Sequence, residues 1–135
     1  MTRTGTVILG TLVGAACARG APPLTPVEAV TSSLRAVASA QEAYYADHGT
    51  YTADLDALRR YPGCHIQLDV TITIHEGTSR GWAASGFHPQ FPERSCVQWV
   101  SRPGGASVPL TRRESRRGDA LPGGVVCDSA AVPHR

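Results

Sequence analysis

The sequence contains no lysine, and none of its apolar runs approaches the about 20 residues that a helix needs to span a bilayer. We therefore expect no transmembrane helix in this chain. Its 13 basic residues, all of them arginines, exceed the 11 acidic residues by 2. So small a net charge does not favour a protein dedicated to binding nucleic acid.

Motifs for catalysis and for cofactor binding are also missing. There is no Gly-rich phosphate loop, no nucleophile elbow and no pair of catalytic carboxylates. His65 and His75 lie ten residues apart on a predicted strand, roughly 33 Å, which is too far to share one metal ion. Cys64 and His65 are adjacent, so a strand would send their side chains to opposite faces. We expect no enzyme, cofactor, metal site or small-molecule substrate.

The composition is that of a folded protein. In 135 residues, 41% are hydrophobic and 18% are charged, which supports a core and excludes disorder of the whole chain. The length suits one small domain preceded by a targeting segment. We predict a signal peptide over residues 1–18, a Pro-rich tether over 19–25 and a single domain over 26–135.

The N-terminal segment is typical of an export signal. Arg3 precedes about ten apolar or small residues over 7–16, the length of a signal-peptide core. Cleavage after Ala18 would release a secreted protein. Alternatively, Cys17 becomes the lipidated first residue of a lipoprotein, although Gly14 stands where such signals usually have a large aliphatic residue. Both processing routes place the mature chain outside the cytoplasm, in the periplasm, at the outer membrane or on the cell surface, where disulfides persist.

The clearest helix signal begins at Thr25. Thr25 can cap the helix, Pro26 suits the first helical position, and Glu28 completes a capping box. Apolar residues then recur at helical spacing, interrupted at Gln41, and Gly49 provides a stop. We predict a helix over 26–48.

The rest of the chain predicts a sheet. A short helix over 53–60, capped by Thr52, precedes a strand over 66–74 in which apolar and polar residues alternate. A turn over 77–81 leads to strands over 82–88, 95–100 and 125–127, with an irregular stretch over 101–124. Neither the helix nor the sheet can bury its apolar face alone. The fold class is therefore α+β, a long N-terminal helix packed on a three- to four-stranded antiparallel sheet.

Four cysteines allow three pairings. Because Cys17 is either lipidated or removed, Cys64, Cys96 and Cys127 remain. We predict a Cys96–Cys127 disulfide that ties the third strand to the last segment. Cys64 is then an odd thiol, for which a buried small residue and an intermolecular bridge are the two interpretations.

The residues from Gln41 to Leu55 carry a family resemblance. The Tyr44-Tyr45 pair, Asp47, Gly49 and Tyr51 resemble the end of the long helix and the first loop in bacterial type IV pilin-like proteins. The likeness extends over roughly residues 30–128 and implies a pilin-like head with a C-terminal disulfide loop. Pilins carry a Phe-led hydrophobic helix that builds the filament, and this sequence has an export signal and tether in its place.

The resemblance implies an exported, non-catalytic structural or accessory protein of the bacterial cell envelope, related to type IV pilus and type II secretion components. Its partners would be other envelope, pilus or secretion-system proteins, and Tyr51 is the predicted interface residue. The alternative is a module that captures a polyanion, DNA or acidic polysaccharide, through the loop 101–120. That loop contains five arginines and two acidic residues, Glu114 and Asp119, which gives it a net charge of +3. The candidate polyanion-binding residues are Arg112, Arg113, Arg116 and Arg117.

Overall fold

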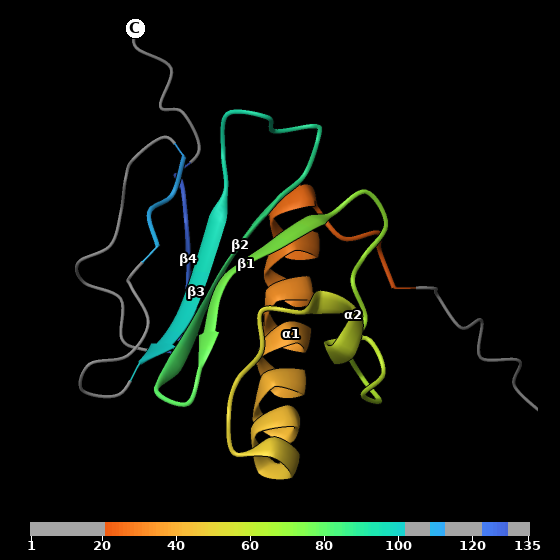
Figure 1. Ribbon diagram of the computed structural model, residues 1–135. Coiled ribbons are helices and arrows are strands. Elements are labelled where there is room, and N and C mark those ends of the chain that lie inside the picture. The colour runs from red at the N-terminus through yellow and green to blue at the C-terminus, as the bar shows by residue number, and fades with distance from the viewer. Residues whose placement is uncertain (1–20, 102–108, 113–122, 130–135) are drawn as a thin grey trace, which may run out of the picture.

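The computed structural model describes residues 21–101, 109–112 and 123–129. Within them the chain forms, in order, α1 (Pro26–His48), α2 (Leu55–Leu58), β1 (Thr71–Thr78), β2 (Gly81–Phe87), β3 (Cys96–Ser101) and β4 (Val125–Cys127). The strands form one antiparallel sheet in the order β1-β2-β3-β4, and α1 lies across one face of it (Figure 1). The fold is a mixed α/β fold with a four-stranded antiparallel sheet.

The helix α1 occupies the residues that its sequence signals predict. The Thr25 hydroxyl accepts a hydrogen bond from the Glu28 N–H at 3.3 Å, and the Glu28 carboxylate accepts one from the Thr25 N–H at 2.8 Å. This capping box satisfies donors that a helix N-terminus leaves unpaired, and it lowers the pKa of Glu28 because its hydrogen bonds favour the charged form. At the other end, Gly49 adopts a left-handed conformation with φ 71° and its N–H bonds to the Tyr45 carbonyl.

The core lies between α1 and the sheet. Leu34 and Val37 of α1 are fully buried against Trp82 and Ala84 of β2. Gly86 gives the helix its close approach, because a Cβ there would lie 2.9 Å from a methyl carbon of Val30. The described part of the chain contains no helix with the length and hydropathy of a membrane span.

Two buried polar side chains of α1 fasten the neighbouring loops. The Gln41 amide donates to the Thr52 carbonyl at 2.7 Å and accepts from the Thr52 N–H at 3.0 Å. The Ser33 hydroxyl donates to the Ala29 carbonyl and accepts from the Gln67 N–H at 2.9 Å. The interruption of the apolar stripe at Gln41 is therefore where the helix holds the loop that follows it.

The prediction of a strand over 66–74 is wrong for its first half, because β1 begins only at Thr71. A turn stands there, in which the Val70 N–H bonds to the Gln67 carbonyl and Asp69 has a positive φ of 63°. Leu68 is 85% exposed. The alternation of apolar and polar residues continues through this turn without a strand, and pairing with β2 begins at Thr71.

Other boundaries also differ. Asp54, not Thr52, caps α2, since its carboxylate accepts from the N–H groups of Asp56 and Ala57, and α2 is a single turn. Gly77 and Thr78 belong to β1, so the hairpin turn is shorter than predicted. Ser101 extends β3 beyond its predicted end. The strand predicted over 125–127 is β4.

Both faces of the central strands are buried. Trp82 and Ala84 face α1, so Ala83 points to the opposite face, where it packs with Val97 and Trp99. These three side chains are at most 3% exposed. In β1, by contrast, Thr71, Thr73 and His75 are exposed, as the alternation of apolar and polar residues indicates.

Candidate functional site

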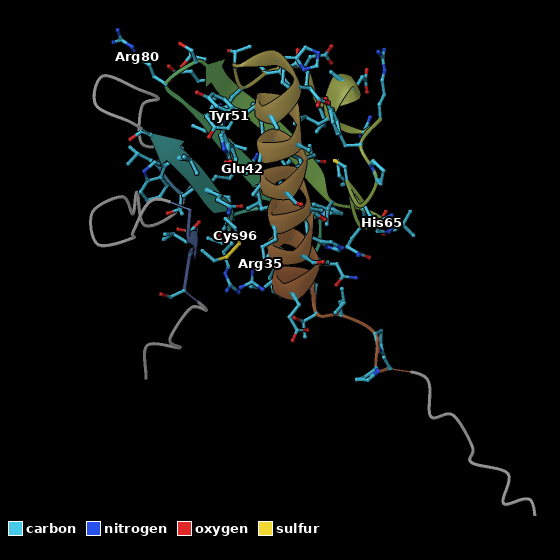
Figure 2. The ribbon with its side chains drawn as sticks, turned by 90° about the horizontal axis from the view of Figure 1, so that it is seen from below. Arg35, Glu42, Tyr51, His65, Arg80 and Cys96 are labelled. Atoms are coloured by element: carbon cyan, nitrogen blue, oxygen red, sulfur yellow. A yellow bond between two sulfur atoms is a disulfide. The ribbon has the colours of Figure 1, made fainter. Side chains whose placement is uncertain are left out.

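The predicted disulfide between Cys96 and Cys127 is present. The two cysteines stand directly opposite each other in the register of β3 and β4, with their Cα atoms 4.0 Å apart (Figure 2). The Thr31 hydroxyl of α1 lies 3.7 Å from the Cys127 sulfur. The disulfide therefore joins the last strand to the sheet at the face that α1 covers.

A compact network of hydrogen bonds surrounds Ser95, at the start of β3. The Ser95 N–H donates to the Asp128 carboxylate at 2.9 Å, and the Asp128 N–H donates to the Ser95 carbonyl at 3.0 Å. The Ser95 hydroxyl accepts from the Arg112 N–H at 2.9 Å. Ser95 and Asp128 are buried. We call these contacts the Ser95 network; it fixes three segments that are distant in sequence beside the disulfide.

Two arginines next to this network lie over aromatic rings. The Arg112 guanidinium is 4.3 Å from the centre of the Phe87 ring and donates to the Pro92 carbonyl at 2.8 Å. The Arg94 guanidinium is 5.0 Å from the centre of the Phe91 ring. Stacking on a ring holds a guanidinium plane in place while its charge stays available to a partner.

A small apolar depression lies between the first turn of α1 and the β2–β3 loop. Its cavity volume is about 20 Å³. Val27 and Val30 of α1, both cysteines of the disulfide, and Phe91 and Arg94 of the β2–β3 loop are among the residues that line it. This volume holds about one water molecule and is far below the roughly 300–1,000 Å³ of sites that bind whole cofactors.

Tyr51, the predicted interface residue, is buried instead. Its side chain is 3% exposed, its hydroxyl donates to the Glu42 carboxylate at 3.1 Å, and its ring lies 4.6 Å from that of Tyr45 (Figure 2). The loop that contains Tyr51 is pulled against β1, where the Tyr51 N–H bonds to the Thr78 carbonyl. Tyr51 therefore supports the fold and offers no surface to a partner.

The remaining predicted site residues fall in two groups. Arg112 belongs to the Ser95 network, whereas Cys17, Arg113, Arg116 and Arg117 lie outside the described residues. His65 is not in a strand, and His75 lies beside the Ser85 hydroxyl at 2.7 Å. In the described ranges no three His, Cys, Asp or Glu side chains lie close enough to hold a metal ion.

Ser95 and Asp128, which build this end of the molecule, carry no signal in the sequence that predicts their contact. Ser95 and Asp128 are 33 residues apart, and neither belongs to a recognisable motif. One signal in the sequence is the position of Phe91 and Arg94 shortly before Cys96, which puts an aromatic ring and a cation close to the disulfide.

No protein-family model matches the sequence, and no curated protein matches it.

Proposed function

We propose that the chain is an exported, non-catalytic accessory protein of the bacterial cell envelope, with a pilin-like head that acts through surface contacts. In this proposal residues 1–18 direct export, Cys17 carries the lipid anchor, and the head works outside the cytoplasm. Its partners are other proteins of the envelope, of a pilus or of a secretion system.

The observation that carries the proposal is the arrangement of α1, the antiparallel sheet and the disulfide. A long helix across a sheet of consecutive antiparallel strands, with a disulfide on the last strand, is the arrangement that the sequence resemblance implies for a pilin-like head. The Gln41–Thr52 contact supports it further, because it fixes the loop after the helix, where the resemblance is most specific. A disulfide is also in keeping with an oxidising compartment.

The test is the processing and location of the chain in a bacterial host. We expect the protein in the envelope fraction, with an intact mass that begins at Cys17 and includes a lipid. Cys96 and Cys127 should resist alkylation until a reductant is added. The matched variant Cys17→Ala should move to the soluble extracytoplasmic fraction with an unchanged disulfide. An unprocessed chain in the cytoplasm with reduced cysteines would contradict the proposal.

A second candidate function is polyanion capture, and the placement of Arg112 favours it. Arg112 is exposed, and its guanidinium is held over Phe87 next to the sequence that supplies Arg113, Arg116 and Arg117. A cluster of fixed cations binds phosphates or sulfates with strong salt dependence. If this function is correct, the protein binds heparin or DNA at low salt, and replacing all four arginines by alanine abolishes that binding. Absence of binding at low salt leaves the accessory role as the proposal.

A further inference from the structure

Ser85 and His75 form a hydrogen-bonded pair on the face of the sheet that α1 does not cover. The His75 Nε2 lies 2.7 Å from the Ser85 Oγ. Ser85 follows Ala84, which faces α1, so its side chain points to the opposite face. A β-bulge between Ile74 and Glu76 leaves His75 without a partner in the register, and such bulges re-aim a side chain. The pairing of β1 with β2 thus brings a hydroxyl and an imidazole into contact.

The pair is accessible from solvent. His75 is exposed and Ser85 is half-buried. In the tautomer whose proton is on Nδ1, the His75 Nε2 accepts the hydrogen bond of the Ser85 hydroxyl. An imidazole in this position takes up the hydroxyl proton as the oxygen forms a new bond, which is how a serine becomes a nucleophile. Ser85 therefore combines a nucleophilic atom, a neighbouring base and access from solvent.

A cation lies next to this pair on the same face. Phe87 is two residues along β2 from Ser85, about 7 Å at roughly 3.3 Å per residue, and its side chain points the same way. The Arg112 guanidinium lies over the Phe87 ring, 4.3 Å from its centre. One of its N–H groups donates to the Pro92 carbonyl, and the planar group has further donors that suit a carboxylate. A molecule that reaches Ser85 thus meets a positive charge on one side.

We propose that Ser85 is an acylation site, at which the chain accepts an acyl group from an ester whose alcohol part carries a carboxylate. The Ser85 Oγ forms a bond to the acyl carbon, the ester C–O bond breaks, and the alcohol leaves. His75 takes the Ser85 proton and returns it to the departing oxygen, while Arg112 holds the carboxylate. This inference goes beyond the accessory function proposed above and does not depend on it.

The product is a long-lived serine ester, because the sheet engages the main-chain groups around Ser85. The strand β2 lies between β1 and β3 and pairs with both. Its N–H groups are therefore not available as oxyanion donors, on which rapid acyl transfer relies. Water attacks the ester slowly for the same reason. We expect one acyl group per chain and no sustained hydrolysis, which is consistent with a non-catalytic function.

The experiment uses two acetyl donors that differ in charge, 4-acetoxy-3-nitrobenzoate and its uncharged methyl ester. Each is incubated with the purified protein at neutral pH, and release of the nitrophenolate is followed by absorbance. Peptide mass spectrometry locates the acetyl group, which we expect at Ser85. Each rate is divided by the rate of the same donor with free imidazole, which corrects for the difference in leaving group. On this scale the charged donor should react about tenfold faster.

Three variants separate the roles. His75→Gln keeps a hydrogen-bonding side chain and removes the base, so it should slow acetylation of Ser85 about 100-fold, and added imidazole should restore part of the rate. Arg112→Gln should remove the preference for the charged donor. Ser79→Ala, at an exposed serine in the hairpin between β1 and β2, is the matched control and should react like the unmodified protein.

The unmodified protein decides the proposal even if a variant fails to fold. Acetylation that occurs at other residues and spares Ser85 would overturn it. So would a folded His75→Gln protein that is acetylated at Ser85 as fast as the unmodified protein, because the base would then have no part in the reaction. Equal corrected rates with the two donors would overturn the assignment of a carboxylate-bearing donor to Arg112.

Discussion

Among single residues, Gln41 has the clearest structural task. Its side chain is fully buried in α1, and its amide donates to the Thr52 carbonyl and accepts from the Thr52 N–H. A helix with a leucine at this position would have a continuous apolar stripe, but the main-chain N–H and carbonyl of Thr52 would lose these hydrogen bonds. The polar interruption thus decides where the loop after α1 turns back toward β1.

We predict that Gln41→Met lowers the free energy of unfolding by about 2–4 kcal/mol, because two partly buried main-chain groups lose their partners. Methionine keeps the length and the helix propensity of the side chain, so packing changes little. The measurement is urea unfolding, with a lower midpoint at an unchanged m-value. Gln90→Met, at an exposed glutamine in the β2–β3 loop, should stay within about 0.5 kcal/mol. A Gln41→Met protein as stable as this control would show that the contact is dispensable.

Cys64 is a thiol whose reactivity depends on its environment. Burial raises the pKa of Cys64 above its ordinary value, and the nearby charge of Arg59 counteracts this in part. We predict that iodoacetamide modifies Cys64 several-fold more slowly in the native protein than in urea at pH 8, as measured by mass spectrometry of its peptide, because the thiolate is the reactive form.

The same raised pKa has a consequence for stability. The native state holds the Cys64 proton more tightly than the unfolded chain does, so the contribution is complete below the unfolded pKa and is lost as the pH rises through the native one. Unfolding midpoints should therefore fall more between pH 8 and pH 10 in the unmodified protein than in Cys64→Ala. Identical alkaline slopes for the two proteins would count against this assignment.

At the scale of elements, the sequence predicted those that local chemistry determines. Thr25, Glu28 and Gly49 act through neighbours within one turn, and α1 has the predicted bounds. The start of β1 was mispredicted because the pattern of Ile66, Leu68 and Val70 is compatible with a strand. The contact that replaces strand pairing there is long-range, because the Gln67 N–H donates to the Ser33 hydroxyl of α1.

The candidate site was predicted only in part, because most of its contacts join residues that are distant in sequence. The Cys96–Cys127 pairing could be predicted because it ties the third predicted strand to the last segment. The contacts of Ser95 with Asp128 and Arg112 depend on the register of β3 and β4 and on where the chain returns to the sheet. Tyr51 was misassigned because a loop tyrosine is exposed unless a long-range contact buries it, and here β1 provides that contact.

The contact between β1 and the loop after α1 depends on Gly77. A Cβ at this position would collide with main-chain atoms of Thr52 and would lie 2.6 Å from the Ala53 nitrogen. Main-chain atoms cannot rotate away, so we predict that Gly77→Ala displaces the loop and costs about 1–3 kcal/mol. The Tyr51 N–H, which bonds to the Thr78 carbonyl, should lose hydrogen-exchange protection.

Gly49→Ala is the control for this prediction. Its φ of 71° disfavours alanine, but nothing lies within 4 Å of the added carbon. It should cost about 1 kcal/mol and leave the Tyr51 amide protected. Unchanged protection of that amide in Gly77→Ala would show that the close approach is not what holds the loop.

In the whole molecule, the apolar depression, the disulfide and the start of α1 lie together, because Pro26, Cys96 and Cys127 all line the depression. Pro26 lines the depression and is nine residues from Cys17, a span of about 30 Å at most when extended. If Cys17 carries lipid, this end therefore faces the membrane at short range.

The disulfide is the strongest single constraint on this end. It closes a separation of 31 residues, which should contribute about 3–4 kcal/mol by restricting the unfolded chain. For a domain of this size that is a large share of the net stability of about 5–15 kcal/mol. We predict that the double variant Cys96→Ala/Cys127→Ala loses this amount in urea unfolding, because the unfolded state gains entropy and β4 is held by only three residues of pairing.

The control is Cys64→Ala, which removes a thiol without opening a loop and should cost about 1 kcal/mol or less. Reducing the unmodified protein should reproduce the loss seen in the double variant, since both open the same loop. Hydrogen exchange should become fast at Val125 and Val126 while the amides of α1 stay protected, because α1 keeps its contacts with β2. A double variant as stable as the oxidised protein would mean that the Ser95 network holds β4 in place by itself, and the depression would then keep its shape without the disulfide.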